Sequence, residues 1–580
     1  MEKKQIIQFY IENNILISPE LIDDLNIPFP INTPFIVLNK DVLLITEHKI
    51  PINVNDYEKA FVLKEKNYNK RLYEKFKEYI LLNIKKEDNI EQEENKNSFD
   101  INITNKQDSP ISKEEDKNSL VIVEKNKEEF PEELSESNID AYKEEYMKKH
   151  RIRVIFDYKE KNKKRTVMDF VGFFNSRFKE LEKILRSRKE LQNPTSISRI
   201  LSKKEKDTVS IIGMVYDKSF SKNNNIILTI EDQTGLIKVV VTQSKEELFL
   251  LAQEIQLDEV IGVTGLYDGL IFANEIIIPD IPLTKELKKS PEEGYFVVIT
   301  DPQIGNKLFL EEEFKKFLQW INGENEKYKD IVSKIKYLFI VGDLVEGVGI
   351  YPDQEYDLSI IDVKEQYKKL AEYLRNIKIP IIVCPGNHDV GRLSEPQPGF
   401  RDEYSKELWM LPNVIALSNP SMVNIFYSDN FEGFNVLLYH GGSFFYYFNN
   451  VQSIRKNGGA TRSDLVMKYL LQRRHLAPSH TSTLYVPDSK KDPLIIDKVP
   501  DFFFSGHVHR STVNNYRNIT CINASCWVAK TEEQERRGLD PQPGRAFVVN
   551  MNNREVKILN FLSKESDDKI SEDKNKYILG

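Results

Sequence analysis

The chain has 580 residues, which is too long for a single hydrophobic core, so two or three domains with linkers are expected. It contains no run of about 18 uncharged apolar residues, so no transmembrane helix is predicted. The polar N-terminus lacks a small-residue cleavage site, and the three cysteines form neither a disulfide framework nor a zinc-binding pattern. These features predict a reducing, cytoplasmic compartment.

The net charge of −8 is concentrated in residues 86–140, which carry 17 Asp or Glu and 7 Lys, a net of −10. The remainder of the chain is therefore +2 (−8 minus −10). A globally acidic protein would be a poor partner for nucleic acid, but acidity confined to one segment largely removes that objection. The segment is nearly free of aromatic residues and cannot offset its ordering entropy by burial, so we predict a disordered acidic linker.

The parts of the chain that flank this linker carry regular secondary-structure patterns. Residues 1–85 place apolar side chains at helical spacing and predict an N-terminal helical unit. Residues 141–200 include a long amphipathic pattern with a basic face and predict a helical connector. Residues 201–285 contain five short runs rich in Val and Ile, with a helical stretch between the third and fourth, which is typical of an OB-like barrel.

Two functions remain open for the OB-like barrel. Such barrels often bind single strands through aromatic side chains on the face of the sheet, and this one has few of them. The available aromatic residues are Tyr216, Phe220, Tyr267 and Phe272. A docking module without its own nucleic-acid site fits the same composition.

Residues 286–565 alternate apolar strands with amphipathic helices, which predicts an α/β domain. Catalytic residues in such sheets lie just beyond the carboxyl ends of the strands. Residues 566–580 are mostly charged and predict a flexible tail. The chain as a whole is therefore expected to be a multidomain α+β protein.

Polar clusters follow the predicted strands of this domain at five places. They contain Asp301 and Gln303; Asp343 and Glu346; Asn387, His388 and Asp389; His440; and His507 and His509. Four of the chain's eight histidines fall in these clusters. A lone histidine is usually a satisfied structural residue, but four of them at strand ends beside Asp and Asn indicate a metal site. Carboxylate, amide and imidazole ligands together suit Mn²⁺, Fe²⁺ or Zn²⁺.

The spacing of these residues fits a pair of metal ions. His507 and His509 are two positions apart, so in an extended segment their side chains point to the same side. The two oxygens of a carboxylate such as Asp343 can bridge two cations. Two metals about 3.5–4 Å apart can clamp a phosphate and hold a hydroxide for in-line attack.

A proton donor is also available beside the ligands. His388 follows Asn387 directly and is placed to protonate a leaving oxygen rather than to bind metal. A nearby carboxylate, either Glu346 or Asp389, could orient the imidazole ring.

The series D-x-[H/Q], GDxx[DE], GNHD, H and GHxH resembles the calcineurin-like metallophosphoesterase superfamily over roughly residues 294–560. The resemblance implies a two-sheet sandwich flanked by helices. Further segments are similar to the small subunits of archaeal family D DNA polymerase, among them GDLVEGVGIYPDQE, EPQPGF, RRHLAPSH, VPDFFFSGHVH and NASCWVAKTEEQERRGLDPQPG. This narrower resemblance covers residues 150–560.

That family implies a proofreading 3′→5′ exonuclease in tight complex with a large catalytic polymerase subunit, acting at the primer 3′ end of DNA. It implies two divalent metals, with Mn²⁺ preferred over Fe²⁺ or Zn²⁺, and His388 as the acid, assisted by Glu346. The residues carried over for the first metal are Asp301, Gln303, Asp343 and His509. Those for the second metal are Asp343, Asn387, His440 and His507.

The sequence departs from the family pattern at two positions. Gln303 stands where the first motif usually has histidine, and an amide oxygen is a weaker donor than imidazole for a softer metal. We therefore expect the first metal to be bound more weakly or to be a different ion. Glu346 stands where the family usually has Asp, which keeps the charge but shifts the carboxylate by about one bond length.

Two other functions are compatible with the sequence. One is a non-catalytic structural subunit of the polymerase with a dead site, and the other is a stand-alone phosphoesterase acting on nucleotides or phosphoproteins. DNA contacts are expected from arginines that flank the motifs and could neutralise backbone phosphates. These are Arg392 and Arg510, with Arg473 and Arg474 as further candidates.

Overall fold

The computed structural model describes residues 38–39, 42–43, 135–562 and 571–572, with gaps at 160–162, 192, 326–327, 489, 532–533 and 536–537. The chain divides into two compact units, Met1–Val123 and Glu124–Gly580. In the first unit, β1 (Leu38–Asn39) pairs antiparallel with β2 (Val42–Leu43). The rest of the predicted helical unit, and the linker up to residue 134, lie outside the described residues. No helix in the described ranges is long and apolar enough to cross a membrane.

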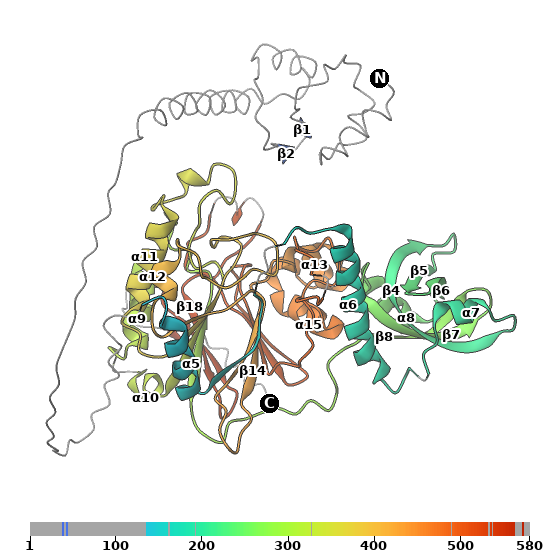
Figure 1. Ribbon diagram of the computed structural model, residues 1–580, viewed down its shortest axis with the longest axis horizontal. Coiled ribbons are helices and arrows are strands. Elements are labelled where there is room, and N and C mark those ends of the chain that lie inside the picture. The colour runs from blue at the N-terminus through green and yellow to red at the C-terminus, as the bar shows by residue number, and fades with distance from the viewer. Residues whose placement is uncertain are drawn as a thin grey trace, which may run out of the picture. The chain divides into compact units, whose positions relative to one another are not determined.

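The larger unit is built around two stacked β-sheets (Figure 1). The seven-stranded sheet has the order β12-β11-β10-β9-β18-β19-β20, and the six-stranded sheet has the order β16-β17-β15-β14-β13-β3. The strands of the first are β9 (Tyr295–Ile299), β10 (Ile335–Val341), β11 (Ile381–Cys384), β12 (Val414–Ala416), β18 (Arg545–Asn550), β19 (Val556–Asn560) and β20 (Ser571–Glu572). Those of the second are β3 (Ile152–Asp157), β13 (Ser421–Ile425), β14 (Phe434–Leu438), β15 (Phe502–Ser505), β16 (Thr512–Tyr516) and β17 (Ile519–Asn523).

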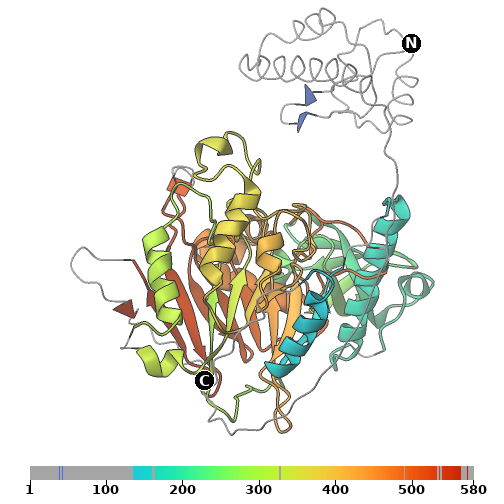
Figure 2. The same ribbon diagram turned by 60° about the vertical axis from the view of Figure 1, so that its left-hand side comes forward.

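Helices cover the outer faces of both sheets, as Figure 2 shows for α9 and α11 in yellow-green and yellow. On the side of the seven-stranded sheet lie α5 (Ile139–Lys149), α9 (Glu311–Ile321), α10 (Lys329–Val332), α11 (Val363–Leu374) and α12 (Lys406–Trp409). The short η2 (Gln354–Tyr356) belongs to the loop between β10 and α11. Against the six-stranded sheet pack α13 (Phe444–Asn450), α14 (Gln452–Lys456), η3 (Gly459–Thr461) and α15 (Ser463–Arg473). The architecture is the predicted two-sheet sandwich flanked by helices.

The sequence pattern explains why the strands that precede the predicted metal ligands are central in the sheet. β10 is buried at every position except Lys336, as expected for a parallel strand covered on both faces. It pairs in parallel with β9 and with β11, so the three strands end at the same edge of the sheet. Phenylalanines fill the space between the sheets, with Phe296 of β9 meeting Phe502 edge to face at 4.9 Å.

The predicted OB-like barrel is present and closed, with strand order β4-β5-β6-β8-β7. Its elements are β4 (Asp207–Phe220), β5 (Ile226–Asp232), β6 (Gly235–Val241), α8 (Glu246–Glu254), β7 (Val260–Tyr267) and β8 (Ile271–Ile277). The helix between the third and fourth strands is where the sequence placed it. Inward-facing Ile, Val and Leu fill the interior, which is therefore a packed core and not a channel.

The predicted helical connector differs from the structure in one respect. It contains α6 (Val167–Arg186) and α7 (Ile197–Leu201), but β3 lies between α5 and α6 and pairs antiparallel with β13. Six residues of mixed polarity give a weak strand signal, and only the unpaired edge of β13 makes them a strand. The connector therefore contributes the edge strand of the six-stranded sheet.

Helix α6 lies between the sandwich and the barrel (Figure 1) and is fixed there by buried charges. Arg177 of α6 donates to Asp492 Oδ2 at 2.7 Å and to the carbonyl of Pro478 at 2.6 Å. Asp492 also accepts a hydrogen bond from His475 Nε2 at 2.8 Å. A second buried pair, Arg473 with Glu259, joins α15 to the residue before β7 at 3.3 Å. The two domains are therefore connected by buried ion pairs and hydrogen bonds in addition to apolar contacts.

Replacing one partner of the Arg177–Asp492 pair should be strongly destabilising. Both side chains are at most 2% exposed, so Asp492→Asn leaves a buried guanidinium without its counter-charge. We expect the free energy of unfolding to fall by about 3–5 kcal/mol. Chemical denaturation of the full chain measures this change. The matched control is Asp497→Asn, because Asp497 is exposed and its carboxylate forms an ion pair with Lys491 at the surface. Equal stability of the two variants would contradict a structural role for the pair.

Candidate metal centre

All seven predicted ligands lie just after the carboxyl ends of sandwich strands. Asp301 and Gln303 follow β9, Asp343 follows β10, and Asn387 follows β11. From the other sheet, His440 follows β14, and His507 and His509 follow β15. β14 and β15 are also parallel to each other, so ligands separated by more than 200 residues meet at one edge of the sandwich.

The residues assigned to the second metal form a compact group. Asp343, His440 and His507 each offer a donor atom within 4.8 Å of the other two, as a shared cation requires. His440 Nε2 lies 3.2 Å from Asp343 Oδ2 and 3.2 Å from Asn387 Oδ1. Its other nitrogen, Nδ1, is 3.1 Å from the carbonyl of Val341. This contact fixes the ring and makes Nε2 the nitrogen that can coordinate a metal.

The residues assigned to the first metal lie beside this group. His509 Nε2 is 3.2 Å from Asp301 Oδ1, and the Asp301 carboxylate also accepts the backbone N–H of His507. The N–H of Gln303 donates to the carbonyl of Asp343 at 3.0 Å, so the first and second motifs run side by side. Gln303 is 4% exposed, which places the amide in the buried part of the site.

Five of the seven residues adopt a left-handed backbone conformation, which is uncommon outside glycine. The φ angles are 49° at Asp301, 47° at Gln303, 48° at Asp343, 69° at His507 and 58° at His509. Each such residue costs on the order of 1 kcal/mol or more and persists only where the surroundings over-determine it. The strand ends therefore turn sharply to aim these side chains at a common point.

Glycines beside the ligands leave space that the ligands fill. A Cβ at Gly386 would stand 2.2 Å from Asp343 Oδ1, and one at Gly342 would stand 2.1 Å from His440 Nδ1. A Cβ at Gly506 would stand 2.3 Å from Asp301 Oδ2. The glycines in the motifs are therefore required by the close approach of the ligands.

The carboxylates and imidazoles of the site shift one another's pKa values strongly because they are buried together. Burial alone lowers the pKa of His440, but the adjacent Asp343 carboxylate outweighs this and raises it to about 10. Burial lowers the pKa of His507 to about 3, with the positive charge of His440 adding to the effect. Burial raises the pKa of Asp343, yet His440 and His388 hold it well below its usual range. A proton on imidazole thus supplies positive charge where a metal would.

The donor set fits divalent metal ions. Asp301 and Asp343 are at most 2% exposed and face imidazole nitrogens, so their negative charge has little solvent to stabilise it. Mixed carboxylate, amide and imidazole donors match borderline divalent cations. Asp343 also accepts the N–H of His388 at Oδ1, 2.8 Å away, while Oδ2 faces His440, so its two oxygens serve different neighbours.

Of the two carboxylates proposed to orient His388, only Glu346 faces the imidazole. His388 Nδ1 lies 2.9 Å from the carbonyl of Glu346 and 3.6 Å from its Oε1. Asp389 instead accepts the N–H groups of Leu344 and Gly386 and the hydroxyl of Tyr367. Asp389 therefore fastens the second motif to the third and does not hold the ring.

The flanking arginines are engaged with the protein itself. Arg392 donates to the carbonyls of Ser394 and Pro396 at 3.1 and 3.0 Å. Arg510 pairs with Asp540 at 2.9 Å. The buried Arg473 pairs with Glu259 at the contact with the barrel, whereas the buried Arg474 donates to the carbonyls of Ile496 and Asp497 within the sandwich. These last two do not present a guanidinium to a bound phosphate.

Sequence reasoning missed the residues that support the ligands. Gln534 Nε2 lies 2.8 Å from His509 Nδ1, and Tyr351 and Gln354 contact Glu346. These residues have no motif spacing of their own. The available signal was their position within GDLVEGVGIYPDQE and NASCWVAKTEEQERRGLDPQPG, the segments on which the family resemblance depends.

Filling the space at Gly386 should weaken metal binding. In Gly386→Ala the new methyl group must displace the Asp343 carboxylate, and we expect the Mn²⁺ affinity to fall by about 10- to 100-fold, as for other disturbed metal environments. Isothermal titration calorimetry measures this. The control is Gly235→Ala in β6, where the nearest atom lies 3.5 Å from the added Cβ. Unchanged affinity in Gly386→Ala would show that Asp343 is not a ligand.

Comparison with known proteins gives the family. Residues 294–511 match the model of the calcineurin-like phosphoesterase, and residues 209–269 match that of the OB-fold nucleic acid binding domain. The DNA polymerase II small subunit of Methanothermobacter thermautotrophicus is 38% identical over 388 residues, which cover 66% of this chain and 77% of that protein. The protein of the same name from Pyrococcus furiosus is 36% identical over 400 residues, covering 68% and 63%.

A third relative extends the similarity to another archaeal lineage. The DNA polymerase II small subunit of Thermoplasma acidophilum is 34% identical over 403 residues, covering 68% of this chain and 78% of that protein. Identity at this level over most of a relative's length fixes the family as well as the fold. The chain therefore belongs to the small subunits of archaeal family D DNA polymerase, named DNA polymerase II in these relatives, and carries a calcineurin-like phosphoesterase domain.

Proposed function

We propose that this subunit is a metal-dependent 3′→5′ exonuclease that hydrolyses DNA phosphodiesters for a replicative polymerase. The observation that carries the proposal is the gathering of Asp343, His440 and His507 donors within 4.8 Å, beside a second set around Asp301 and His509. A structural subunit would have no need of strained strand ends that aim buried carboxylates and imidazoles at one point.

Two divalent metal ions, for which we propose Mn²⁺ with Fe²⁺ or Zn²⁺ as the other fitting ions, would polarise the phosphate and lower the pKa of water so that hydroxide is available to attack the phosphorus. The residues that would hold one ion are Asp301, Gln303, Asp343 and His509. Those for the other are Asp343, Asn387, His440 and His507. Asp343 would be shared because its two oxygens already face different partners.

The proton for the leaving group would come from His388. The Nδ1 atom of this residue is held by the carbonyl of Glu346 at 2.9 Å, so Nε2 is the nitrogen left to face a substrate. Glu346 supplies negative charge 3.6 Å from the ring and would stabilise the imidazolium form. In this role His388 protonates the departing 3′ oxygen of the primer strand.

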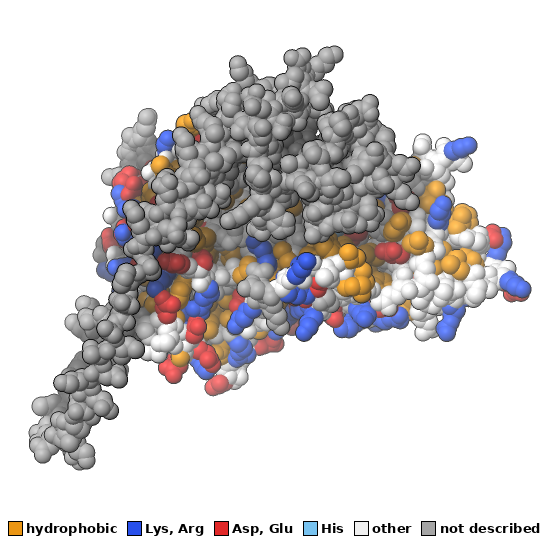
Figure 3. All heavy atoms as spheres, turned by 45° about the horizontal axis from the view of Figure 1, so that its top comes forward, with side chains coloured by type: hydrophobic (Ala, Val, Ile, Leu, Met, Phe, Trp, Pro, Cys, Tyr) orange, Lys and Arg blue, Asp and Glu red, His pale blue; other side chains and the backbone are white. Residues whose placement is uncertain are grey.

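The proposal includes a large catalytic polymerase subunit as partner, as the name of the relatives implies, and the primer 3′ end of DNA as substrate, in the cytoplasm. Figure 3 shows basic and acidic side chains interspersed over the described part of one face, so DNA contact there would depend on particular side chains. Arg392 and Arg510 remain the proposed phosphate contacts, and each would exchange a present partner for phosphate.

One observation favours the alternative of a non-catalytic accessory subunit. Gln303 occupies a ligand position with an amide, the weakest metal donor of the set. A site that binds only one ion would keep the fold without efficient hydrolysis.

Removal of a ligand should abolish nuclease activity. With Mn²⁺ and a mispaired primer, we expect His440→Ala and Asp343→Ala to lower the degradation rate by at least about 100-fold, because charge stabilisation in the transition state depends on these ligands. The matched control is His480→Ala, because His480 is an exposed histidine that pairs with Asp258. Mass spectrometry should show a parallel loss of bound metal. Unchanged degradation in the ligand variants would refute the exonuclease proposal.

Changing Gln303 to histidine tests the weaker of the two sites. Because imidazole is a better donor than an amide for Mn²⁺ or Zn²⁺, Gln303→His should tighten the weaker of two binding events by about tenfold and leave the other unchanged. Calorimetric titration with each metal resolves the two steps. Gln319→His, at an exposed position of α9, controls for a histidine that binds metal at the surface. A single unaltered binding step would favour the accessory subunit.

A further inference from the structure

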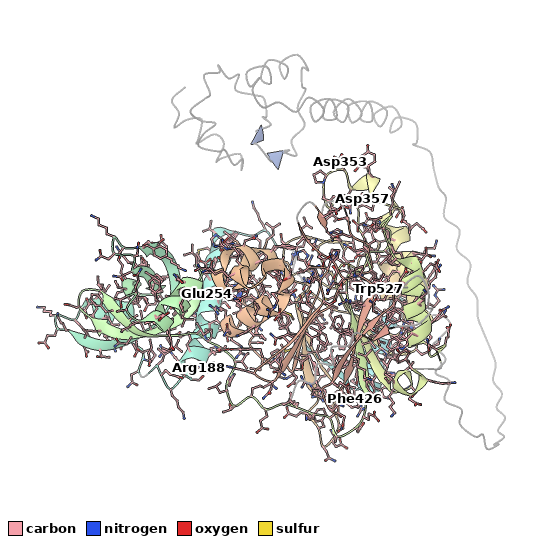
Figure 4. The ribbon with its side chains drawn as sticks, turned by 180° about the vertical axis from the view of Figure 1, so that it is seen from behind. Arg188, Glu254, Asp353, Asp357, Phe426 and Trp527 are labelled. Atoms are coloured by element: carbon pink, nitrogen blue, oxygen red, sulfur yellow. The ribbon has the colours of Figure 1, made fainter. Side chains whose placement is uncertain are left out.

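The loop between β10 and α11 turns back onto the residue that holds the proposed acid. Figure 4 labels Asp353 and Asp357 at the outer end of this loop. From its inner side, the Tyr351 hydroxyl donates to Glu346 Oε1 at 3.1 Å. Gln354 Nε2 donates to the same oxygen at 3.1 Å and to the Glu346 carbonyl at 2.9 Å. The loop thus grips both the side chain and the backbone of Glu346.

Glu346 depends on these donors because it is 1% exposed. Of its two side-chain oxygens, Oε1 faces Tyr351, Gln354 and His388, while within the described part of the chain Oε2 is buried without a hydrogen-bond partner. A buried carboxylate is costly unless it accepts hydrogen bonds, so the positions of its hydrogen-bond donors determine its orientation. The orientation of Glu346 toward the imidazole is therefore set by the loop.

Tyr351 also contacts the imidazole directly. Its ring stands edge-on to that of His388, with centroids 6.1 Å apart and planes at 61°. Its hydroxyl lies between two carboxylates, Glu346 at 3.1 Å and Asp357 at 3.0 Å, but has one hydrogen to donate. Asp357 is exposed and can be solvated by water, whereas Glu346 cannot, so the hydrogen stabilises the site most when it is donated to Glu346.

We propose that Tyr351 is a positioning residue for the leaving-group proton transfer. Its hydroxyl holds Glu346 Oε1 beside His388 Nδ1, and its ring limits the rotation of the imidazole, so that Nε2 stays aimed at the departing oxygen. The proposal rests on the proposed phosphodiesterase function and adds to it a residue outside the metal ligands. No such role follows from the motif pattern, in which Tyr351 is five positions beyond Glu346.

If Tyr351 has this role, the rate lost in Tyr351→Phe should depend on the leaving group of the substrate. An alkoxide such as the 3′ oxygen of DNA departs slowly unless it is protonated, whereas p-nitrophenolate departs without a proton. We expect Tyr351→Phe to lower kcat on DNA by about 10- to 100-fold, the cost of a misplaced catalytic group, with KM nearly unchanged. On the p-nitrophenyl ester of thymidine 5′-phosphate the same variant should lose less than about threefold, because general acid catalysis contributes little there.

The test uses the full chain with Mn²⁺ and measures both substrates for wild type, Tyr351→Phe and His388→Ala. Adding Tyr351→Phe to His388→Ala should cause no further loss, since residues that act through one group are not additive. Tyr356→Phe is the matched control, because the Tyr356 side chain is an exposed tyrosine on the same loop. Thermal unfolding of each variant checks that the fold is intact.

A second variant shows which of the two carboxylates, Glu346 or Asp357, the Tyr351 hydroxyl acts through. Asp357→Ala removes the exposed one, so the hydrogen stays on Glu346 and the rate on DNA should be equal to or above that of wild type. If Asp357→Ala reproduces the loss in Tyr351→Phe, the hydroxyl acts through Asp357 and the proposal is wrong. This variant alters an exposed side chain and keeps the test valid even if Tyr351→Phe folds poorly.

The outcomes distinguish the positioning role from the function on which it rests. If wild type hydrolyses DNA but Tyr351→Phe equals wild type, or loses the same factor on both substrates, the positioning role is overturned and the nuclease function stands. If wild type hydrolyses neither substrate, the proposed function fails and the positioning role fails with it. Selective loss on DNA, absent in Tyr356→Phe, supports the proposal.

Discussion

The Asp343 carboxylate is the group on which the rest of the site depends. It is 2% exposed, and its two oxygens face different partners: the backbone N–H of His388 at one and the imidazole of His440 at the other. A buried carboxylate is costly unless it is paired, so the surrounding histidines or bound cations are a condition of its burial. The nearby Gly386 is explained by the same constraint, because any side chain there would occupy the space of the carboxylate.

The fold brings the proposed ligands together by ending parallel strands at one edge. β9, β10 and β11 in one sheet, and β14 and β15 in the other, each deliver one or two of these residues two to four positions after the last strand residue. The left-handed turns at five ligands complete the arrangement. Sheet packing supplies the free energy that holds these strained conformations, since the strands between them are almost entirely buried apolar residues.

The residues of the site fall into three groups, and each group is harder to identify from the sequence than the one before. The ligands carry the motifs, the glycines provide space for them, and residues from distant loops fix their orientation. Tyr351 and Gln354 act on Glu346 from the β10–α11 loop, and Gln534 acts on His509 from the segment before β18. The same principle holds the domains together, where Arg177, Asp492 and His475 form a buried set that joins α6 to the sandwich.

The amino-acid sequence predicted the OB-like barrel from strand periodicity and the sandwich from the motif resemblance, and it nominated the candidate metal-site residues, because periodicity and short-range motifs are local properties. It did not determine that residues 152–157 form an edge strand, since a short strand exists only where a neighbour offers unpaired backbone. Nor could it choose between Glu346 and Asp389 as the partner of His388, or show that Arg473 and Arg474 are buried. Those outcomes depend on which groups meet across distant loops, and only the tertiary structure decides that, because contact between residues far apart in the chain is set by packing and not by spacing.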